Sequence, residues 1–288
     1  MIICIVGPTG VGKTKLSVEL AKKYNAIIVN CDAMQVYKGL DIGTAKVKEE
    51  EKEGIPHYLF DIKEVNEDYT VFDYQKDART LIEEYKDKNI IFVGGTGLYL
   101  KAALYDYRFA IETSPKKDYS SYTNEELYKL IKEKDINVTI HPNNRVRMER
   151  FLNKQEVEEV EPIKLYNHYL IGLTTDREIL YDRINKRVDI MVEEGLLEEA
   201  KSFYDKSIKT KPLMGGIGYK ELYEYFDNKI SLTEALDKIK QNSRRYAKRQ
   251  YTFFNNQLDV EWFNTDFNNF QNTINNVVDY ISNQEKKN

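Results

Sequence analysis

The sequence has little cysteine and no long hydrophobic run. Among its 288 residues the only cysteines are Cys4 and Cys31, too few for a disulfide framework or a cysteine-based zinc module. No apolar stretch approaches the roughly 18 residues that a membrane-spanning helix requires, and no basic, apolar export signal opens the chain. We therefore expect a soluble cytoplasmic protein that makes no contact with a membrane.

The sequence also lacks a strong excess of either charge. Lysine and arginine number 43 and aspartate and glutamate 47, so the formal net charge is −4. A small negative charge argues weakly against a polyanionic partner. The basic residues are clustered, however, in residues 145–150 and 244–249, and such local clusters matter more for a partner than the net charge does.

A complete phosphate-binding motif follows the first apolar run of the chain. It consists of Gly7, Pro8, Thr9, Gly10, Val11, Gly12, Lys13 and Thr14. The glycines let successive backbone N–H groups turn toward an anion, Lys13 adds a positive charge, and the Thr14 hydroxyl can bind a phosphate-held Mg²⁺. A glycine-rich turn can also serve packing alone, but here every motif position is filled between a predicted strand and a predicted helix. The motif therefore predicts a site for a phosphorylated ligand.

Strand-like and helical patterns alternate along the chain, which predicts an α/β fold: a P-loop NTPase-like parallel sheet flanked by helices. The expected strands are residues 2–6, 26–30, 58–62, 90–93, 169–173 and 260–263. The expected helices of this core are residues 13–24, 71–86, 97–104, 176–205, 218–227 and 231–255, with a last helix from residue 267.

A weakly patterned stretch interrupts this core. Between residues 106 and 167 the pattern predicts only two modest helices, at residues 124–134 and 144–153. We interpret residues 106–167 as a small helical insertion domain. Residues 1–105 and 168–288 would then form one catalytic core with C-terminal helices.

Two further segments leave predicted strands near the phosphate loop. Ligands of parallel sheets gather beyond the carboxyl ends of the strands, so Asp32, after strand 26–30, can act as a metal ligand or general base. Capping of the next turn is the alternative role. Thr96, in the glycine-rich turn after strand 90–93, presents a hydroxyl near a helix N-terminus, although a packing turn is about equally well supported.

Taken together, these segments resemble the tRNA dimethylallyltransferase family over nearly the whole chain. The most specific matches are the segments Asp32 to Tyr37 and Arg245 to Gln250. Further matches, in the family's order, are Pro56 to Asp61, His141 to Asn144, Arg183 to Asp189 and Ile217 to Glu221. The resemblance implies transfer of the dimethylallyl group of dimethylallyl diphosphate to the N6 amine of an adenosine, with release of diphosphate. That adenosine is 3′-adjacent to the anticodon in tRNAs reading codons that begin with U.

The family's pattern also implies roles for the residues of the site. Asp32 would accept or orient the amine proton, and Thr96 would hydrogen-bond the substrate or the leaving oxygen. Lys13 and Arg187 would neutralise the departing diphosphate, with Mg²⁺ as a cofactor held through Thr14 and the diphosphate. For Arg183, one helical turn before Arg187, a solvated helix face with Glu178 and Glu194 as partners is the alternative.

The resemblance further implies a surface for tRNA. The residues implied to contact tRNA are Asp32, Ala33, Met34, Gln35, Thr96, Arg147, Arg150, Arg244 and Lys248. Lys240, Arg244 and Lys248 share one stripe of the predicted helix 231–255, for which a solvated helix face is the alternative. The insertion departs from the family, because it is short and Val146 stands where the family has glutamine before the two arginines. We therefore expect retained transferase chemistry with an altered or weaker grip on RNA.

Two other functions remain open at this stage. The same scaffold can prenylate free adenylate nucleotides, and the short insertion leaves room for that acceptor. A P-loop kinase or ATP-dependent regulator, a different class, would need an ATP-selective base pocket and an acidic partner for a hydroxyl acceptor. The expected partners are dimethylallyl diphosphate and the anticodon stem-loop, with no obligate protein partner and a monomer as the default state.

Overall fold

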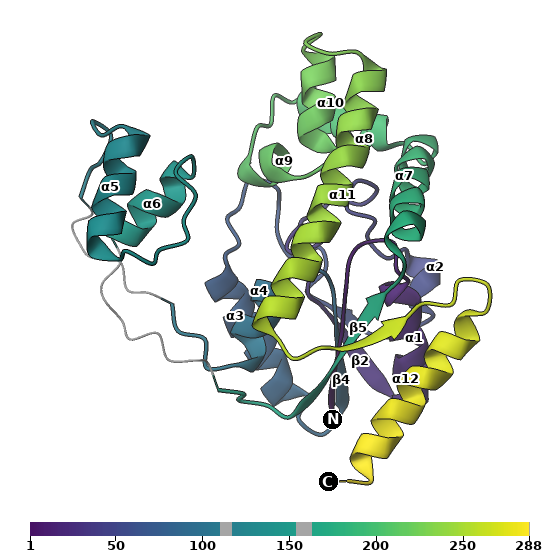
Figure 1. Cartoon of the computed structure of the whole chain (residues 1–288). Coiled ribbons are helices and arrows are strands. Elements are labelled where there is room, and N and C mark those ends of the chain that lie inside the picture. Colours follow the sequence, from purple (N-terminus) through teal and green to yellow (C-terminus); the bar gives the residue numbers. More distant parts are fainter. Residues whose placement is uncertain (110–116, 154–162, 288) are drawn as a thin grey trace. The chain divides into compact units, whose positions relative to one another are not determined.

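The computed structural model describes residues 1–109, 117–153 and 163–287 (Figure 1). The chain divides into two compact units. The larger comprises Met1–Asp106 and Lys164–Asn288, and the smaller comprises Tyr107–Ile163. The expectations about the segments 110–116 and 154–162 of the insertion lie outside the described residues.

The larger unit is built on a parallel sheet. Its strands are β1 (Ile2–Val6), β2 (Ala26–Asn30), β3 (His57–Tyr58), β4 (Asn89–Val93), β5 (His168–Thr174) and β6 (Glu261–Asn264). They lie in the order β3-β2-β4-β1-β5-β6, and every pair of neighbours is parallel. The predicted α/β fold with a parallel sheet is confirmed.

The apolar runs of the strands explain why the sheet has two buried faces. In β1, Ile3 and Ile5 pack into one hydrophobic core while Cys4 and Val6 pack into another, since successive side chains of a strand point to opposite faces. A strand buried on both faces reads as a continuous apolar run rather than an alternating one. This is the pattern that residues 2–6 present.

Helices cover both faces of the sheet (Figure 1). The helices in the described part of the larger unit are α1 (Lys13–Tyr24), α2 (Glu49–Lys52), α3 (Val71–Glu84), α4 (Gly97–Leu104), α7 (Arg177–Glu193), α8 (Leu196–Tyr204), α9 (Lys211–Gly215), α10 (Tyr219–Phe226), α11 (Leu232–Gln257) and α12 (Phe270–Glu285). Helices α1 and α12 contribute to the core that contains Ile3, and α3 and α4 to the core that contains Cys4. The long helix α11 packs against α10, α7 and α4.

Three predicted elements differ from the structure by more than two residues or by an internal break. The strand expected at residues 58–62 ends after Tyr58, because Leu59 and Asp61 adopt positive φ angles and the chain turns. The helix expected at residues 176–205 is broken into α7 and α8 by Gly195, whose φ of +105° is left-handed. The last helix begins at residue 270 rather than 267, because the Asp266 side chain accepts backbone hydrogen bonds from residues 268 and 269.

The smaller unit contains the two helices that the sequence predicts, α5 (Asn124–Lys134) and α6 (Arg145–Leu152). Thr123 caps α5 in a capping box with Glu126. The core of the unit consists of Tyr119, Leu127, Ile131 and Met148.

The residues that the structure describes include no helix long and apolar enough to cross a membrane.

Candidate functional site

A cavity of about 740 Å³ lies in the larger unit, where the loops after β1, β2 and β4 meet. Its lining includes Lys13 and Thr14 of the phosphate loop, Asp32 after β2, Thr96 after β4 and Arg187 of α7. The sheet topology explains this meeting, because parallel strands end at the same edge. These residues come from four separate segments of the chain. The same cavity is also lined by the predicted site residues Thr9, Gly10, Gly12, Ala33, Met34 and Gln35.

The phosphate loop presents backbone N–H groups at the N-terminus of α1. Gly10 and Gly12 adopt φ angles of +86° and +94°, which a side chain would strain, and no side chain caps the helix at Gly12. Uncapped N–H groups and the positive end of the helix dipole favour an anion at this position. The Thr14 hydroxyl belongs to an exposed side chain that lines the cavity.

Lys13 is held inside the cavity. Its Nζ donates a hydrogen bond of 2.7 Å to the Pro8 carbonyl. Burial lowers the pKa of Lys13 to about 8, an effect that the Asp32 carboxylate opposes and Arg187 reinforces. Burial destabilises the charged form of Lys13 in the empty cavity, and a bound anion would stabilise that charge.

Asp32 faces the same charges from the next loop. One of its carboxylate oxygens accepts a hydrogen bond from the Met34 backbone N–H at 2.9 Å. Burial raises the pKa of Asp32 above its ordinary value, against the Met34 hydrogen bond and the charges of Lys13 and Arg187. A raised pKa makes a carboxylate a stronger base, and the cavity keeps part of the side chain accessible.

Thr96 joins the loop after β4 to the loop that carries Asp32. Its hydroxyl oxygen accepts a hydrogen bond of 3.0 Å from the Ala33 backbone N–H, and its own N–H donates to the Cys31 carbonyl at 3.0 Å. Behind this turn, the Gln250 side chain of α11 donates to the Gly95 carbonyl at 3.1 Å. The position of the Thr96 hydroxyl is therefore fixed relative to Asp32.

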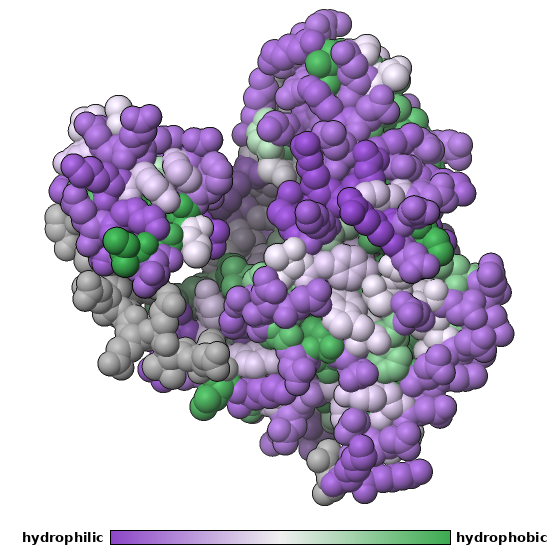
Figure 2. Space-filling view, in the orientation of Figure 1, coloured by the Kyte–Doolittle hydropathy of each residue, from purple (hydrophilic) through white to green (hydrophobic). Residues whose placement is uncertain are grey.

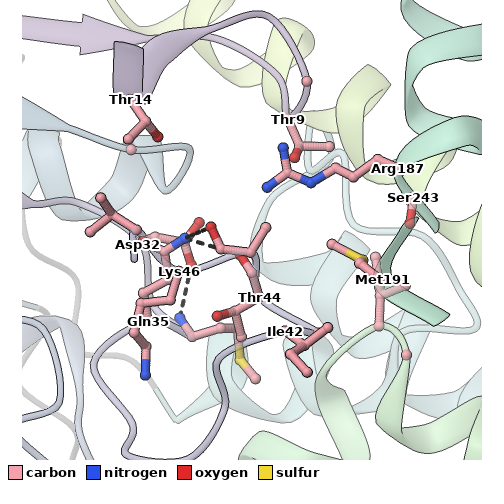
Figure 3. A pocket seen from close by; sticks show the side chains of 18 of the residues that line it. Thr9, Thr14, Asp32, Gln35, Ile42, Thr44, Lys46, Arg187, Met191 and Ser243 are labelled. Atoms are coloured by element: carbon pink, nitrogen blue, oxygen red, sulfur yellow. Dashed lines mark hydrogen bonds between the residues drawn. The ribbon is translucent and has the colours of Figure 1, made fainter. Parts of the chain in front are cut away.

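Arg187 and Arg183 differ in their surroundings although one helical turn separates them. The guanidinium of Arg187 points into the cavity toward Thr9 (Figure 3), and its buried Nε has no hydrogen-bond partner among the described residues. Arg183 is exposed, and its Nε donates to the Gly10 carbonyl at 2.9 Å while its guanidinium lies 3.7 Å from the ring centroid of Phe267. Arg183 thus braces the phosphate loop rather than pairing with Glu178 or Glu194.

The basic stripe of α11 is only partly free. Lys240 forms an ion pair of 2.6 Å with Asp189, and Arg244 donates to the Asn185 side chain at 2.5 Å, both on α7. The Lys248 side chain is exposed, with no ion pair or hydrogen bond to another described residue. Strongly hydrophilic side chains gather over the middle of α11 in Figure 2. The stripe therefore offers Lys248 to a ligand more readily than Arg244.

In the smaller unit, the arginines of α6 divide into two kinds. Arg145 donates to the carbonyls of Tyr119 and Tyr122 and pairs with Glu149, so it holds the unit together. Arg147 and Arg150 are exposed, and neither side chain contacts another described residue through an ion pair or hydrogen bond. They are therefore available to a ligand.

Tyr246 and Gln250 line the cavity from α11, and sequence reasoning gave neither a role of its own. Tyr246 is partly buried, and burial raises the pKa of its phenol. Gln250 is 4% exposed. Their spacing of four residues places both on one face of the helix, but only the fold reveals that this face closes the cavity.

The known proteins to which this chain is similar are named as isopentenyl- or dimethylallyltransferases. The IPP transferase family matches residues 35–257. A tRNA dimethylallyltransferase of Anoxybacillus flavithermus is 46% identical over 97% of this chain and 96% of its own length, and that of Bacillus subtilis is 43% identical over 91% and 90%. The structure of a full-length tRNA isopentenylpyrophosphate transferase from Bacillus halodurans is similar with a TM-score of 0.78, at 42% identity and coverage of 99% and 97%. A eukaryotic dimethylallyltransferase, described as acting on tRNA, is also similar with a TM-score of 0.78, at 28% identity over 98% of this chain and 79% of that chain.

Proposed function

The chain belongs to the IPP transferase family, and on that basis we propose that it is a tRNA dimethylallyltransferase. It transfers the dimethylallyl group of dimethylallyl diphosphate to the N6 amine of the adenosine 3′-adjacent to the anticodon, in tRNAs reading codons that begin with U. The observation that carries the proposal is the cavity in which an anion-binding loop and a partly buried carboxylate face each other. An amine acceptor and a diphosphate leaving group need those two features.

The phosphate loop binds the diphosphate and stabilises it as it leaves. The bond between the allylic carbon and the diphosphate oxygen breaks, and its electron pair departs with the diphosphate. The Lys13 ammonium, the Arg187 guanidinium and the N–H groups at the start of α1 offset this growing charge. Arg187 has a buried Nε without a described partner, as expected of a group whose partner is the ligand.

Asp32 acts at the other end of the reacting pair. The N6 nitrogen forms a bond to the allylic carbon, and one of its protons passes to the Asp32 carboxylate. An adenine amine is a poor nucleophile, because its lone pair is delocalised into the ring, so a positioned base lowers the barrier. Thr96 holds its hydroxyl beside Asp32 and hydrogen-bonds the substrate from there.

The residues present fit a Mg²⁺ ion held mainly by the diphosphate. The described residues contain no cluster of three or more His, Cys, Asp or Glu side chains suited to a metal, whereas Thr14, the last residue of the phosphate-binding motif, has an exposed side chain with a hydroxyl. Magnesium commonly takes few protein ligands and completes its shell with substrate phosphates and water. When bound, the ion would supply further neutralisation of the diphosphate charge.

The pH dependence of diphosphate binding tests the role of Lys13. We expect the affinity of the empty protein for dimethylallyl diphosphate to fall as the pH rises through about 8, because Lys13 then loses its proton. Lys13→Arg keeps its charge over this range, so its affinity should vary less with pH. Titration calorimetry of both proteins measures the affinity at each pH. Changes in the protonation of the diphosphate itself affect both proteins equally. Identical pH profiles would show that Lys13 does not bind the diphosphate.

Dimethylallyl diphosphate alone does not identify the acceptor, and the basic residues favour RNA over a free nucleotide. The groups proposed to contact tRNA are Arg147 and Arg150 of the smaller unit, Arg244 and Lys248 of α11, and the loop from Asp32 to Gln35 with Thr96. Arg244 is already bound to Asn185, so its replacement would also disturb the packing of α11 on α7. Lys248 and its exposed neighbour Arg245 are the cleaner probes of RNA phosphate contacts.

Salt dependence tests this surface. We expect Lys248→Ala and Arg245→Ala each to weaken binding of an anticodon stem-loop and to reduce the slope of log affinity against log salt by roughly one. Lys23→Ala is the matched control, since exposed Lys23 lies at the end of α1 farthest from the phosphate loop. Unchanged slopes in both variants would make this part of α11 a solvated helix face.

One assay separates the proposed function from its alternatives. The protein is incubated with labelled dimethylallyl diphosphate and, in parallel, with an anticodon stem-loop carrying three consecutive adenines, with AMP, or without acceptor. Label on the stem-loop supports the proposal. Equal labelling of AMP would favour the free-nucleotide enzyme, and hydrolysis of added ATP without transfer of label would favour an ATP-dependent regulator.

A further inference from the structure

A carboxylate outside the cavity binds the loop that forms part of the cavity wall. Glu199, on α8, accepts hydrogen bonds from three consecutive backbone N–H groups, those of Asp41, Ile42 and Gly43, at 3.0, 2.7 and 3.0 Å. The Tyr219 hydroxyl donates a fourth hydrogen bond at 2.6 Å. The two carboxylate oxygens thus accept four hydrogen bonds, which matches their four lone pairs. Hydrogen bonds to a charged acceptor are also stronger than neutral ones.

The surroundings of this contact make the loop conformation specific. Tyr219 is fully buried, and burial, with the charge of Glu199, raises the pKa of its phenol. A Cβ atom on Gly43 would lie 2.7 Å from atoms of the Tyr219 ring, so only glycine allows the loop to approach this closely. The loop therefore rests on a rigid aromatic surface while Glu199 binds its backbone.

The bound loop is continuous with the cavity wall. Ile42, Gly43 and Thr44 line the cavity, and Figure 3 draws Ile42 and Thr44 on the side away from Thr14 of the phosphate loop. The Gln35 side chain donates to the Thr44 carbonyl at 3.0 Å, which connects the loop to the segment after Asp32. With Met191 of α7, Ile42 gives this side an apolar character, which suits a nucleobase face or a dimethylallyl group better than the diphosphate itself.

We propose that Glu199 is a positioning residue for the acceptor. It holds residues 41–43 in the conformation that walls the side of the cavity away from the phosphate loop, and it touches neither substrate. The inference rests on the proposed function, because it assigns this wall to the RNA acceptor. Loss of the carboxylate would leave three loop N–H groups without their partner, and the loop would sample other conformations. Acceptor binding should then weaken while diphosphate binding is unaffected.

Substitutions at Glu199 and its neighbours test the proposal in the full-length protein. We expect Glu199→Ala to weaken stem-loop binding about tenfold or more, with affinity for dimethylallyl diphosphate within about twofold of wild type. Glu199→Gln, which replaces one acceptor oxygen by a donor, should fall between. Tyr219→Phe removes one donor but leaves the carboxylate on the loop, so its effect should be smaller. Glu198→Ala, at an exposed position on the same helix, is the matched control.

Amide hydrogen exchange gives a readout that does not depend on activity. The N–H groups of residues 41–43 should exchange faster in Glu199→Ala and Glu199→Gln than in the control. Faster exchange with unchanged stem-loop affinity, or an equal loss of affinity for both substrates, would overturn the proposal. If Glu199→Ala does not fold, Glu199→Gln and Tyr219→Phe decide by the same measurements. A wild-type protein that binds the stem-loop without prenylating it would refute the proposed function, while the binding data would still test Glu199.

Discussion

Replacing Lys13 by alanine should reduce transferase turnover by about two to three orders of magnitude without unfolding the protein. This is the scale expected when one preorganised charge is removed from a leaving group. The Lys13 ammonium lies inside the cavity, and burial lowers its pKa to about 8, so water screens its charge poorly. Because that burial also makes the charge costly in the empty protein, its removal should cost little stability.

Single-turnover rates with a saturating stem-loop measure the effect, and thermal unfolding followed by circular dichroism checks the fold. Lys23→Ala provides the control, because Lys23 is exposed in the last turn of α1 and does not line the cavity. Wild-type turnover in a folded Lys13→Ala protein would show that the phosphate loop does not serve the diphosphate.

The central part of the site could be predicted because it depends on local sequence and on one rule of sheet geometry. The phosphate loop is a contiguous motif between a strand and a helix. Asp32 and Thr96 each follow a buried strand, and parallel strands end at a common edge. Their meeting with Lys13 in one cavity follows from these facts without any knowledge of side-chain packing.

The remaining parts depend on contacts between distant segments and on backbone conformations that composition does not specify. Asparagine, aspartate and glycine favour turns, but nothing in Leu59 signals the positive φ angle with which the chain leaves β3. The binding of Glu199 to the N–H groups of residues 41–43 joins positions more than 150 residues apart. Likewise, Arg244 and Lys248 look equivalent on one helical stripe, and only the packing of α7 distinguishes them.

Replacing Asp32 by asparagine should lower turnover by about two to four orders of magnitude, the range associated with loss of a positioned general base. Asparagine keeps the shape of the side chain and its ability to accept the hydrogen bond from Met34, but it cannot take the proton of the adenine amine. Affinity for dimethylallyl diphosphate should change little, because the phosphate loop is left intact. Single-turnover rates and equilibrium binding of the diphosphate, measured on the same protein, separate the two effects.

The pH profile gives the sharper test of the base. Burial raises the pKa of Asp32, so its carboxylate is protonated at a higher pH than an ordinary aspartate and wild-type turnover should fall as the pH is lowered. This acidic limb should be absent from the residual activity of Asp32→Asn. Asp68→Asn, which changes an exposed carboxylate that does not line the cavity, should retain the limb. If Asp32→Asn instead loses diphosphate affinity and keeps its turnover, Asp32 orders the diphosphate or its metal, and the base must be sought elsewhere in the cavity.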